Sequence, residues 1–389
     1  MRSIAGELER IQEALWKSLQ EEARRAMEGT LNRMMEAERM LFVGVSPYER
    51  HELRRGLRNG YDSRTLDSRC GPLRLRIPKV RQSAERFRTR ILRAYQRRQD
   101  ALDQLALEWV ACGMSTRAVS EQLNRAFGAL VSPGTISALV GQVDAERTAF
   151  HERRFSRGYR YVYLDGKHGK VCRPSYRRGR GRAVEAVLLL AWGIRHDGSE
   201  ELIDFRVARD ESEASWSAFL LSMRDRGLVE ENRFSERLER FISDGDSGIE
   251  AALAMVYPET PQQVCVFHKI KNLLGDLADK SCKAAIQGQA GAIFEASNRA
   301  EALARLERWK RLWQEREPVA VGHFIRDLDR MLLFYESEPF LRRRLKTSNP
   351  VERFIRELER KFERVGVFPN AKSWDRITFI VYRQLVLRG

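Results

Sequence analysis

The sequence has few cysteines for its length, and they are scattered. Five of the 389 residues are Cys, and no two form a Cys-x-x-Cys pair. An odd, dispersed set argues against a disulfide framework and against a zinc site built from cysteines alone. The sequence also lacks a run of the roughly 18–20 apolar residues that span a membrane, and its opening residues, MRSIAGELER, lack the apolar core of a secretion signal. We therefore expect a soluble, cytoplasmic protein with no membrane segment.

Acidic residues are too few to balance the basic ones. Lys and Arg number 70 against 54 Asp and Glu, a formal net charge of +16. Residues 51–100 hold 14 Arg and one Lys against five acids, a net charge of +10. This local excess predicts a polyanionic partner, most often nucleic acid. With 43% hydrophobic residues the chain can bury a core, which excludes a wholly disordered protein, and its length predicts two or three domains.

Within this basic segment, arginines alternate with apolar residues. The stretch Leu73-Arg74-Leu75-Arg76-Ile77 predicts a short strand with one apolar and one cationic face. The planar guanidinium of Arg donates two hydrogen bonds to a phosphate at once. We expect the strand and the residues after it to contact the backbone of double-stranded DNA, through Arg74, Arg76, Lys79 and Arg81. The alternative is a charged face with a structural role only.

Helices are expected on both sides of this segment. In 1–41, Leu8, Ile11, Leu15 and Leu19 recur at helical spacing, so this helix either packs locally or pairs with a second subunit. Residues 101–145 favour a helix-turn-helix, with Ser115 capping the second helix and Ser132-Pro133 starting the third. The third helix would offer its exposed face, including Thr135, Ser137 and Gln142, to a DNA groove. A plain three-helix packing unit is the alternative.

The periodicity changes to that of strands near residue 158. Three strands, then alternating helices and strands, predict a mixed sheet with helices on its faces. The expected strands are 159–164, 186–192, 202–207, one starting at 241–243, and 264–267; the expected helices are 212–226, 248–256, several within 269–345, and a last one after Pro350. A basic, glycine-broken stretch at 173–182 suits an exposed hairpin turn, where Arg177 and Arg178 are further candidates for DNA contact.

Three carboxylates are candidates for catalysis. Asp165 and Asp244 each end an apolar strand and precede a glycine, and Glu352 lies in the first turn of the last helix. If the two strands are neighbours, the two aspartates repel each other unless a cation lies between them, and Mg²⁺ prefers such oxygen ligands. The alternatives are structural roles, in which Asp244 caps the following helix and Glu352 closes a capping box. Asp246 is the main competitor of Asp244.

Cys265 and His268 form a Cys-x-x-His motif at the expected end of the last strand. It is a weak zinc signal, because four ligands are usual and no second pair is within reach. Either the pair is a buried Cys and a surface His, or His268 contacts a phosphate or tunes a carboxylate at the sheet edge.

The sequence resembles the Mutator-type insertion-sequence transposases of bacteria over nearly its whole length. The matching motifs occur in the family's order: Glu38-Arg39, Tyr48-Glu49-Arg50 and Arg58-Asn59-Gly60; Gly71-Pro72-Leu73-Arg74-Leu75-Arg76-Ile77-Pro78; Ser132-Pro133-Gly134-Thr135-Ile136-Ser137; Leu164-Asp165-Gly166; Ser212-Glu213-Ala214-Ser215-Trp216; Ser243-Asp244-Gly245; Cys265-Val266-Phe267-His268; and Ser348-Asn349-Pro350-Val351-Glu352 followed by Gly366-Val367-Phe368-Pro369-Asn370.

The resemblance implies a ribonuclease-H-like domain with an Asp-Asp-Glu site. Its acids fall on Asp165, Asp244 and Glu352, which would hold two Mg²⁺ ions, with Mn²⁺ able to substitute. The family's Cys-x-x-His and tryptophan fall on Cys265, His268 and Trp216, near the site, where Trp216 either contacts DNA or only packs. One departure is Asp246, where relatives often have His.

The resemblance also implies a fold class and a layout. The class is an α/β mixed-sheet, ribonuclease-H-like catalytic domain with an all-helical insertion, preceded by helical DNA-binding and dimerisation domains. The expected parts are a helical region at 1–50 for dimerisation, a basic DNA-contacting segment at 51–100, a helix-turn-helix at 101–150, the first part of the catalytic core at 151–268, the insertion at 269–345, and the rest of the core at 346–389.

The expected function is that of a bacterial DNA transposase, which is nucleoid-associated when bound to DNA. As a homodimer it would bind the terminal inverted repeats of an insertion sequence, cleave strands there with metal ions, and join them to target DNA. The alternative is a catalytically inert, sequence-specific DNA-binding regulator derived from a transposase.

Overall fold

The computed structural model describes residues 4–129, 131–173, 182–232, 234–347 and 349–386. The chain forms two compact units, Met1–Gln142 and Val143–Gly389. Among the described helices, none combines the length and the apolar character needed to cross a membrane. The six-part division expected from the sequence stays a prediction.

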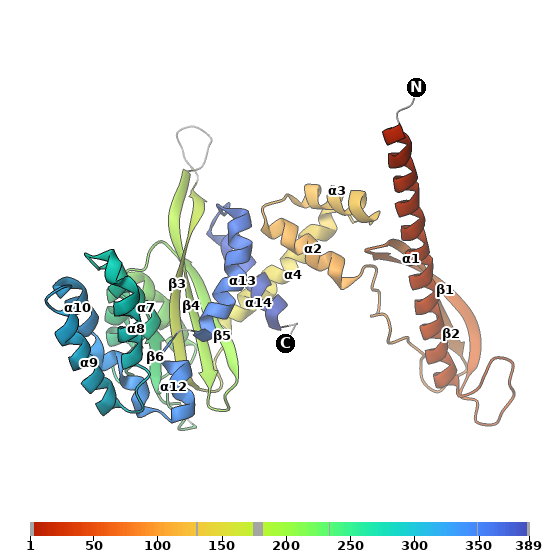
Figure 1. The fold of residues 1–389 in the computed structure, drawn as a ribbon. Helices are drawn as coiled ribbons and strands as arrows, with labels where there is room; N and C mark the ends of the chain where they lie inside the picture. Colours follow the sequence, from red (N-terminus) through yellow and green to blue (C-terminus); the bar gives the residue numbers. More distant parts are fainter. Residues whose placement is uncertain (1–3, 130, 174–181, 233, 348, 387–389) are drawn as a thin grey trace. The chain divides into compact units, whose positions relative to one another are not determined.

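The first unit begins with a long helix and a hairpin (Figure 1). Helix α1 covers Ile4–Val43, and strands β1 (Leu57–Ser68) and β2 (Gly71–Arg81) pair antiparallel. Leu73 and Leu75 are buried in a small core, whereas Arg74 and Arg76 are exposed. The predicted alternation of β2 is therefore confirmed. Strand β1 was not predicted, because its sequence LRNGYDSRTLDS lacks a run of alternating apolar residues.

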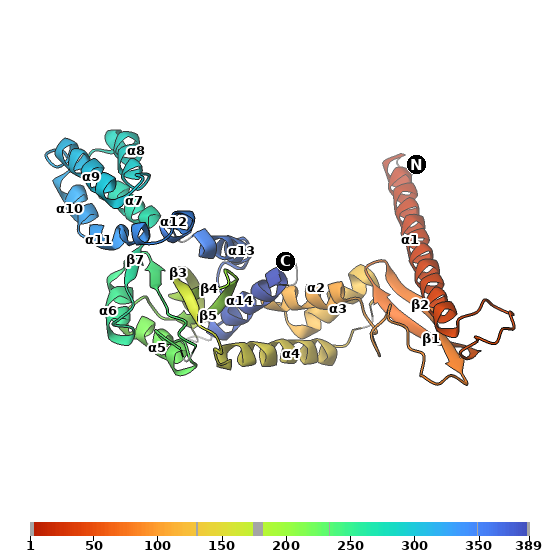
Figure 2. The same cartoon turned by 90° about the horizontal axis from the view of Figure 1, so that it is seen from below.

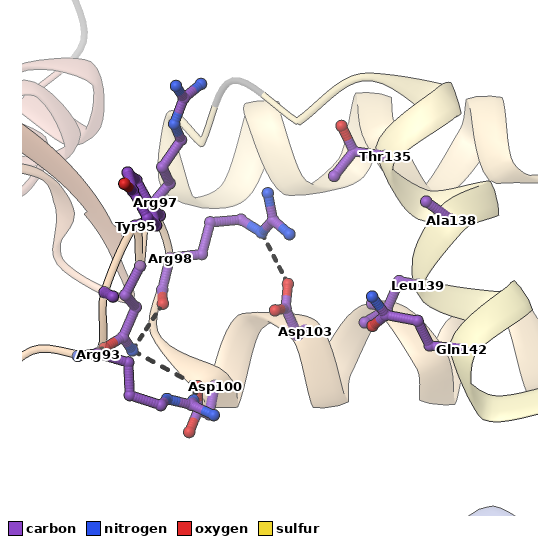
Figure 3. Close-up of a pocket in the computed structure, with 12 residues that line it drawn as sticks. Arg93, Tyr95, Arg97, Arg98, Asp100, Asp103, Thr135, Ala138, Leu139 and Gln142 are labelled. Carbon is purple, nitrogen blue, oxygen red and sulfur yellow. Dashed lines mark hydrogen bonds and ion pairs between the residues drawn. The ribbon is translucent and has the colours of Figure 1, made fainter. Parts of the chain in front are cut away.

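The first unit also contains α2 (Asp100–Ala111), α3 (Thr116–Phe127) and the first half of α4 (Pro133–Glu152), whose residues from Val143 on belong to the second unit. The hydroxyl of Ser115 accepts a hydrogen bond from the Ala118 N–H at 3.1 Å, and that of Ser132 accepts one from the Thr135 N–H at 3.1 Å. Both predicted helix starts are thus confirmed. Before α2, Arg98 Nε donates to Asp103 Oδ1 at 2.7 Å (Figure 3). The helices share one apolar core, which includes Leu102, Ala106, Val119, Leu123 and Ile136.

A five-stranded mixed sheet forms the centre of the second unit. Its spatial order is β5-β4-β3-β6-β7. The strands are β3 (Tyr159–Arg173), β4 (Arg182–Arg195), β5 (Glu200–Ala208), β6 (Arg240–Ser243) and β7 (Gln262–Val264). Strand β4 pairs antiparallel with β3 and β5, whereas β6 pairs in parallel with β3 and β7. The predicted mixed sheet is confirmed, and β3 and β4 are longer than predicted.

Helices cover both faces of this sheet (Figure 2). Helices α5 (Glu213–Asp225) and α6 (Ser247–Val256) pack together on one face, where Val162 and Leu164 of β3 join their core. Helices α13 (Asn349–Val365) and α14 (Ala371–Val386) contact β3 and β5. Gly169 of β3 allows a close approach there, because a Cβ atom at that position would lie 2.6 Å from the Trp374 ring.

The last strand is displaced from its predicted position. The sequence indicated a strand at 264–267, but β7 ends at Val264 and helix α7 (Val266–Gly275) begins two residues later. Cys265 is therefore the residue before α7, and His268 lies in the first turn of this helix. The error arose because Gln262 and Gln263 are polar. Their buried amides donate hydrogen bonds to the Ser243 hydroxyl at 2.6 Å and to the Met331 carbonyl at 2.9 Å.

Short helices follow α7, as the all-helical prediction for 269–345 required. They are α8 (Lys283–Ile293), α9 (Arg299–Trp313), α10 (Pro318–Ile325), α11 (Leu328–Met331) and α12 (Pro339–Leu345), with 3-10 turns at Lys280–Cys282 and Leu333–Glu336. Trp309 and Trp313 are buried, as expected of core residues. Two helices, α13 and α14, stand where one was predicted after Pro350.

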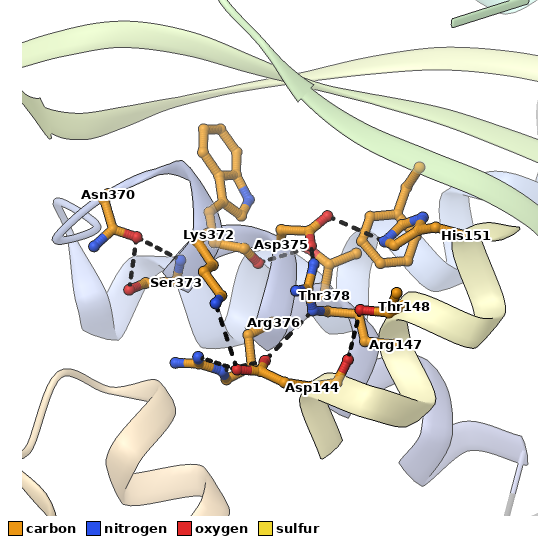
Figure 4. Close-up of polar contacts among 12 residues, drawn as sticks. Asp144, Arg147, Thr148, His151, Asn370, Lys372, Ser373, Asp375, Arg376 and Thr378 are labelled. Atoms are coloured by element: carbon orange, nitrogen blue, oxygen red, sulfur yellow. Dashed lines mark hydrogen bonds and ion pairs between the residues drawn. The ribbon is translucent and has the colours of Figure 1, made fainter. Parts of the chain in front are cut away.

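A largely buried network of charges joins α4, β5 and α14. His151 Nδ1 lies 2.7 Å from Asp204 Oδ1 of β5. Its Nε2 lies 3.3 Å from Asp375 Oδ1 of α14 (Figure 4). Arg226 pairs with Asp204, and Arg147 pairs with Asp375. Burial alone would lower the pKa of His151, but its hydrogen bonds to the two aspartates outweigh burial and raise the pKa to about 9.

We predict that His151→Gln destabilises the second unit at neutral pH. Because the folded-state pKa is raised, the contribution of His151 is complete below its unfolded pKa of about 6.5 and is lost as the pH rises through about 9. The expected loss at pH 7 is about 2–3 kcal/mol. Thermal unfolding between pH 6 and pH 10 measures it, since the two melting temperatures should converge above pH 9. The exposed His196 provides the control His196→Gln, and equal melting temperatures at pH 7 would contradict the prediction.

Candidate active site

Two of the predicted acids lie side by side in the sheet. The prediction that Asp165 ends its strand is wrong, because β3 continues to Arg173, whereas Asp244 does follow the last residue of β6. In the parallel pair β3–β6, Tyr163 is opposite Ile242. Asp165 and Asp244 follow two residues further along each chain. Equal steps along neighbouring parallel strands keep residues side by side. The structure therefore brings these two predicted site residues together.

Asp165 is a largely buried acid beside another acid. Burial raises the pKa of the Asp165 carboxyl to about 6, the positive charge of His268 opposes the rise, and the negative charge of Asp244 adds to it. The Gly166 N–H donates to Asp165 Oδ1 at 2.8 Å. The ionised form of Asp165 is thus disfavoured in the protein alone, and a bound cation would favour it.

The Cys-x-x-His motif supplies the positive charge beside Asp165, through the side chain of His268. Cys265 is fully buried and His268 is half-buried. A hydrogen bond with Cys265 raises the pKa of His268 to about 9 against the opposing effect of burial, and the charges of Asp165 and Asp244 add to the rise. Of the two readings left open by the sequence, the one in which His268 tunes a carboxylate agrees with this arrangement.

The competing aspartates have structural partners. Asp246 is the N-cap of α6, where its Oδ1 accepts the Gly248 N–H at 2.8 Å. Asp244 Oδ1 instead accepts the Asp246 N–H at 3.1 Å and does not cap the helix. Asp204 belongs to the network around His151. Asp244 is therefore the acid of the 244–246 pair that stands next to Asp165.

Helix α13, which carries Glu352, contacts β3. Before α13 begins, the Arg344 carbonyl accepts a hydrogen bond from the Tyr163 hydroxyl of β3 at 3.1 Å. Within α13, Glu359 pairs with Lys167 of β3. These two contacts lie on either side of Asp165 along the strand, and Glu352 lies between them along the chain. Glu352 is in the first turn of α13, as predicted.

The three predicted acids do not form a metal cage in this conformation. Among the described residues, no three His, Cys, Asp or Glu side chains are grouped closely enough to hold a metal ion. The pair Asp165–Asp244 nevertheless fits a divalent cation, because it presents carboxylate oxygens side by side and burial disfavours the free anion of Asp165.

A further acid, Glu211, lies at this site and was missed by the sequence analysis. Its Oε1 would be 1.6 Å from a Cβ atom on Gly166, so Glu211 fills the space of the missing side chain. Burial raises the pKa of Glu211, and the charges of Asp244 and Asp246 add to the rise. Its Oε2 lies 3.3 Å from His168 Nε2. The one sequence signal for Glu211 is the glycine of the Leu164-Asp165-Gly166 triplet, because a glycine next to an acid leaves room for a second side chain.

Trp216 lies in the core and not at the protein surface. Its side chain has no exposed area and packs with Phe219 and Leu220 among the residues of the α5–α6 core. Of the two expected roles, the structure shows packing. A contact between Trp216 and DNA would require this core to open.

The predicted DNA-contacting residues lie mostly on the surface of the first unit. Arg74, Arg76, Arg81 and Ser137 are exposed, and Thr135 is half-buried. Lys79 is partly exposed and pairs with Asp62 at 2.7 Å. The further candidates Arg177 and Arg178 lie outside the described residues.

We predict that Asp165→Asn stabilises the metal-free protein at pH 8. A raised folded-state pKa means that ionising Asp165 costs stability, by about 1–3 kcal/mol above pH 6, and that this cost vanishes as the pH falls toward 4. Thermal unfolding in a chelator should show a higher melting temperature for the variant at pH 8 and a smaller difference at pH 5. Added Mg²⁺ should raise the melting temperature of the wild type more than that of the variant. A variant less stable than the wild type at pH 8 would contradict the assigned environment.

Comparison with known proteins agrees with the resemblance seen in the sequence. The chain belongs to the Mutator family of transposases, which it matches over residues 2–386. It is 30% identical over 387 residues to the transposase of insertion sequence element IS406 from Burkholderia multivorans, covering 99% of this chain and 96% of that protein. It is 29% identical over 362 residues to the transposase of IS1201 from Lactobacillus helveticus, covering 92% of each. The transposase of ISRM5 from Rhizobium meliloti is 30% identical over 354 residues, 91% of this chain and 85% of that protein.

Proposed function

We propose that the protein is a DNA transposase that binds the terminal inverted repeats of an insertion sequence and catalyses strand cleavage and strand transfer at one site. The observation that carries the proposal is the adjacent pair Asp165 and Asp244, one within β3 and the other directly after the parallel neighbour β6, in a member of a transposase family. The relatives are named as transposases of insertion sequence elements, which supports this role.

The strand order supports a ribonuclease-H-like catalytic domain. Three antiparallel strands followed by two parallel ones, with helices on both faces, place Asp165 at the central strand and Asp244 on its neighbour. The helices between α7 and α12 would be the insertion between the second acid and Glu352.

Asp165, Asp244 and Glu352 would hold two Mg²⁺ ions in the DNA-bound state. Such ions, when bound, supply activation of the attacking oxygen and stabilisation of the leaving oxygen in phosphoryl transfer. The protein's own part is to hold the two aspartates side by side and to pack α13, which carries Glu352, against β3. His268 provides a positive charge beside the two aspartates, where it can bind a phosphate oxygen.

The reaction consists of two phosphoryl transfers. Water first attacks a phosphodiester at the element end, which frees a 3′-hydroxyl. That hydroxyl then attacks a phosphodiester of target DNA. The exposed arginines of β2 would bind phosphates and position the duplex, while the exposed face of α4 reads base edges.

We predict that Asp165→Ala abolishes cleavage and strand transfer but leaves end binding nearly intact. Losing one oxygen donor of the metal site should cost at least roughly two to three orders of magnitude in rate, whereas the DNA-binding surfaces do not involve Asp165. Labelled end DNA incubated with Mg²⁺ or Mn²⁺ measures nicking and joining, and an electrophoretic shift measures binding. The exposed Asp197 provides the control Asp197→Asn.

This experiment also separates the transposase from the alternative. An inert regulator would bind the ends with no nicking or joining by the wild-type protein in either metal. Equal loss of binding and of strand transfer in Asp165→Ala would count against the catalytic assignment.

Pairing two element ends requires two active sites, and α1 has a surface suited to a homodimer. Ile11, Leu15 and Leu19 recur on this helix and are all exposed, at 64%, 57% and 45%. The structure thus shows no local packing for this stripe.

We predict that Leu15→Glu converts the dimer to a monomer. A charge at the centre of the apolar stripe would be buried without a partner in the pair, which should weaken association at least roughly 100-fold. Light scattering after size-exclusion chromatography measures the mass. Leu41, on the same helix and 72% exposed, provides the control Leu41→Glu. A monomeric wild type, or a Leu15→Glu dimer, would refute the assignment.

A further inference from the structure

The first unit contains a cleft whose lining combines arginines with uncharged polar and apolar side chains. Its volume is about 420 Å³, and one wall is the segment before α2 while the other is the exposed side of α4 (Figure 3). Its lining includes Tyr95, Arg97, Thr135, Ala138 and Gln142. Tyr95, Arg97 and Gln142 are exposed, so the cleft is open to a ligand that continues beyond it.

Tyr95 is displayed at the rim of this cleft in an unusual backbone conformation. Its side chain is 89% exposed, and its φ angle is 61°, in the left-handed region that residues other than glycine seldom adopt. A large aromatic ring held in solvent by an unfavourable backbone serves no packing purpose. Such outliers persist where the surrounding structure enforces them and often mark functional positions.

The surrounding structure does hold this segment in place. The Asp67 N–H donates to the Arg97 carbonyl at 2.8 Å, and the Gln99 N–H donates to the Asp67 carbonyl at 2.9 Å. Gln96 Nε2 donates to the Arg98 carbonyl at 3.0 Å. The segment is thus tied to β1, and Tyr95 is presented at a fixed place.

The three arginines of the cleft have different tasks. Arg93 pairs with Asp100, and Arg98 pairs with Asp103, so both fasten the segment to α2. Within the part of the chain that the structure describes, Arg97 makes no ion pair and its side chain is exposed. Arg97 is therefore the guanidinium that can bind an incoming anion, and a planar fork of this kind suits a phosphate.

The opposite wall has the character of a base-reading surface. Thr135 and Gln142 offer hydroxyl and amide groups, and Ala138 and Leu139 between them offer apolar surface. Groups of these types contact base edges and thymine methyls in the major groove. The two walls together therefore match one DNA strand, with a phosphate on one side and base edges on the other.

We propose that this cleft holds one strand of the duplex at the element end: Arg97 binds a phosphate, the Tyr95 ring packs against the adjoining deoxyribose and base, and α4 reads the neighbouring base pairs. This inference rests on the proposed function, because it names a contact within the same DNA complex. It adds Tyr95 and Arg97 to the residues that the sequence singled out.

Binding of a labelled end duplex across roughly 50–250 mM salt tests the Arg97 contact. Arg97→Gln should weaken binding roughly tenfold and reduce the slope of log affinity against log salt by about one. Arg88→Gln removes the same charge from the same basic segment, but Arg88 is exposed outside the cleft, so its loss should be about twofold. Equal losses in the two variants would overturn the phosphate contact, since general electrostatics would then explain both.

Tyr95→Asn tests the ring without endangering the fold, because Asn tolerates the left-handed backbone better than Tyr. We expect binding at least about fivefold weaker, with an unchanged salt slope and loss of protection over a few nucleotides in a footprint. Tyr48 is also fully exposed with a φ of 66°, and Tyr48→Asn should bind as the wild type does. Wild-type affinity in Tyr95→Asn, or equal losses in both tyrosine variants, would overturn the proposal. A wild-type protein without preference for end DNA would instead refute the proposed function, so the two failures are distinguishable.

Discussion

The placement of two carboxylates side by side, on neighbouring parallel strands, is the constraint on which the rest of the candidate site depends. Pairing β3 and β6 in parallel forces Asp165 and Asp244 together, and burial makes the charge of Asp165 costly. A fold built for stability alone would avoid this pair. Here the pairing of β3 with β6, the helix cap formed by Asp246 and the positive charge of the His268 side chain all help to hold the two aspartates together. In active sites in general, packing in the rest of the fold offsets the free-energy cost of holding charged groups in electrostatically unfavourable positions.

Much of the fold could be read from the sequence because its local signals agree with its tertiary structure. Ser115 and Ser132 are strong helix starts, and both hydroxyls cap helices. The alternation in β2 has period two, and burial follows it. Asp165 and Asp244 were identifiable because each follows an apolar run and precedes a glycine, although β3 continues past Asp165 to Arg173. Such features depend on a few neighbouring residues, which the sequence displays directly.

The failures share another cause, since each depends on distant partners. Strand β7 is polar, and its glutamines are accommodated by Ser243 and Met331, residues that sequence periodicity cannot connect with it. Glu211 reaches the site only because the turn before α5 returns to Gly166. Tyr95 stands out by a backbone angle and an exposure that no sequence pattern encodes. The position of Glu352 relative to the two aspartates likewise depends on how α13 packs.

The glycine after Asp165 has a steric role in the candidate site. The carboxylate of Glu211 occupies the volume where any side chain at residue 166 would begin. Even a single added methyl group would have to evict that carboxylate or push the strand aside. Because this carboxylate is the end of a flexible side chain, a substitution of Gly166 would displace Glu211 first, and so change the acids around Asp165 without removing any of them.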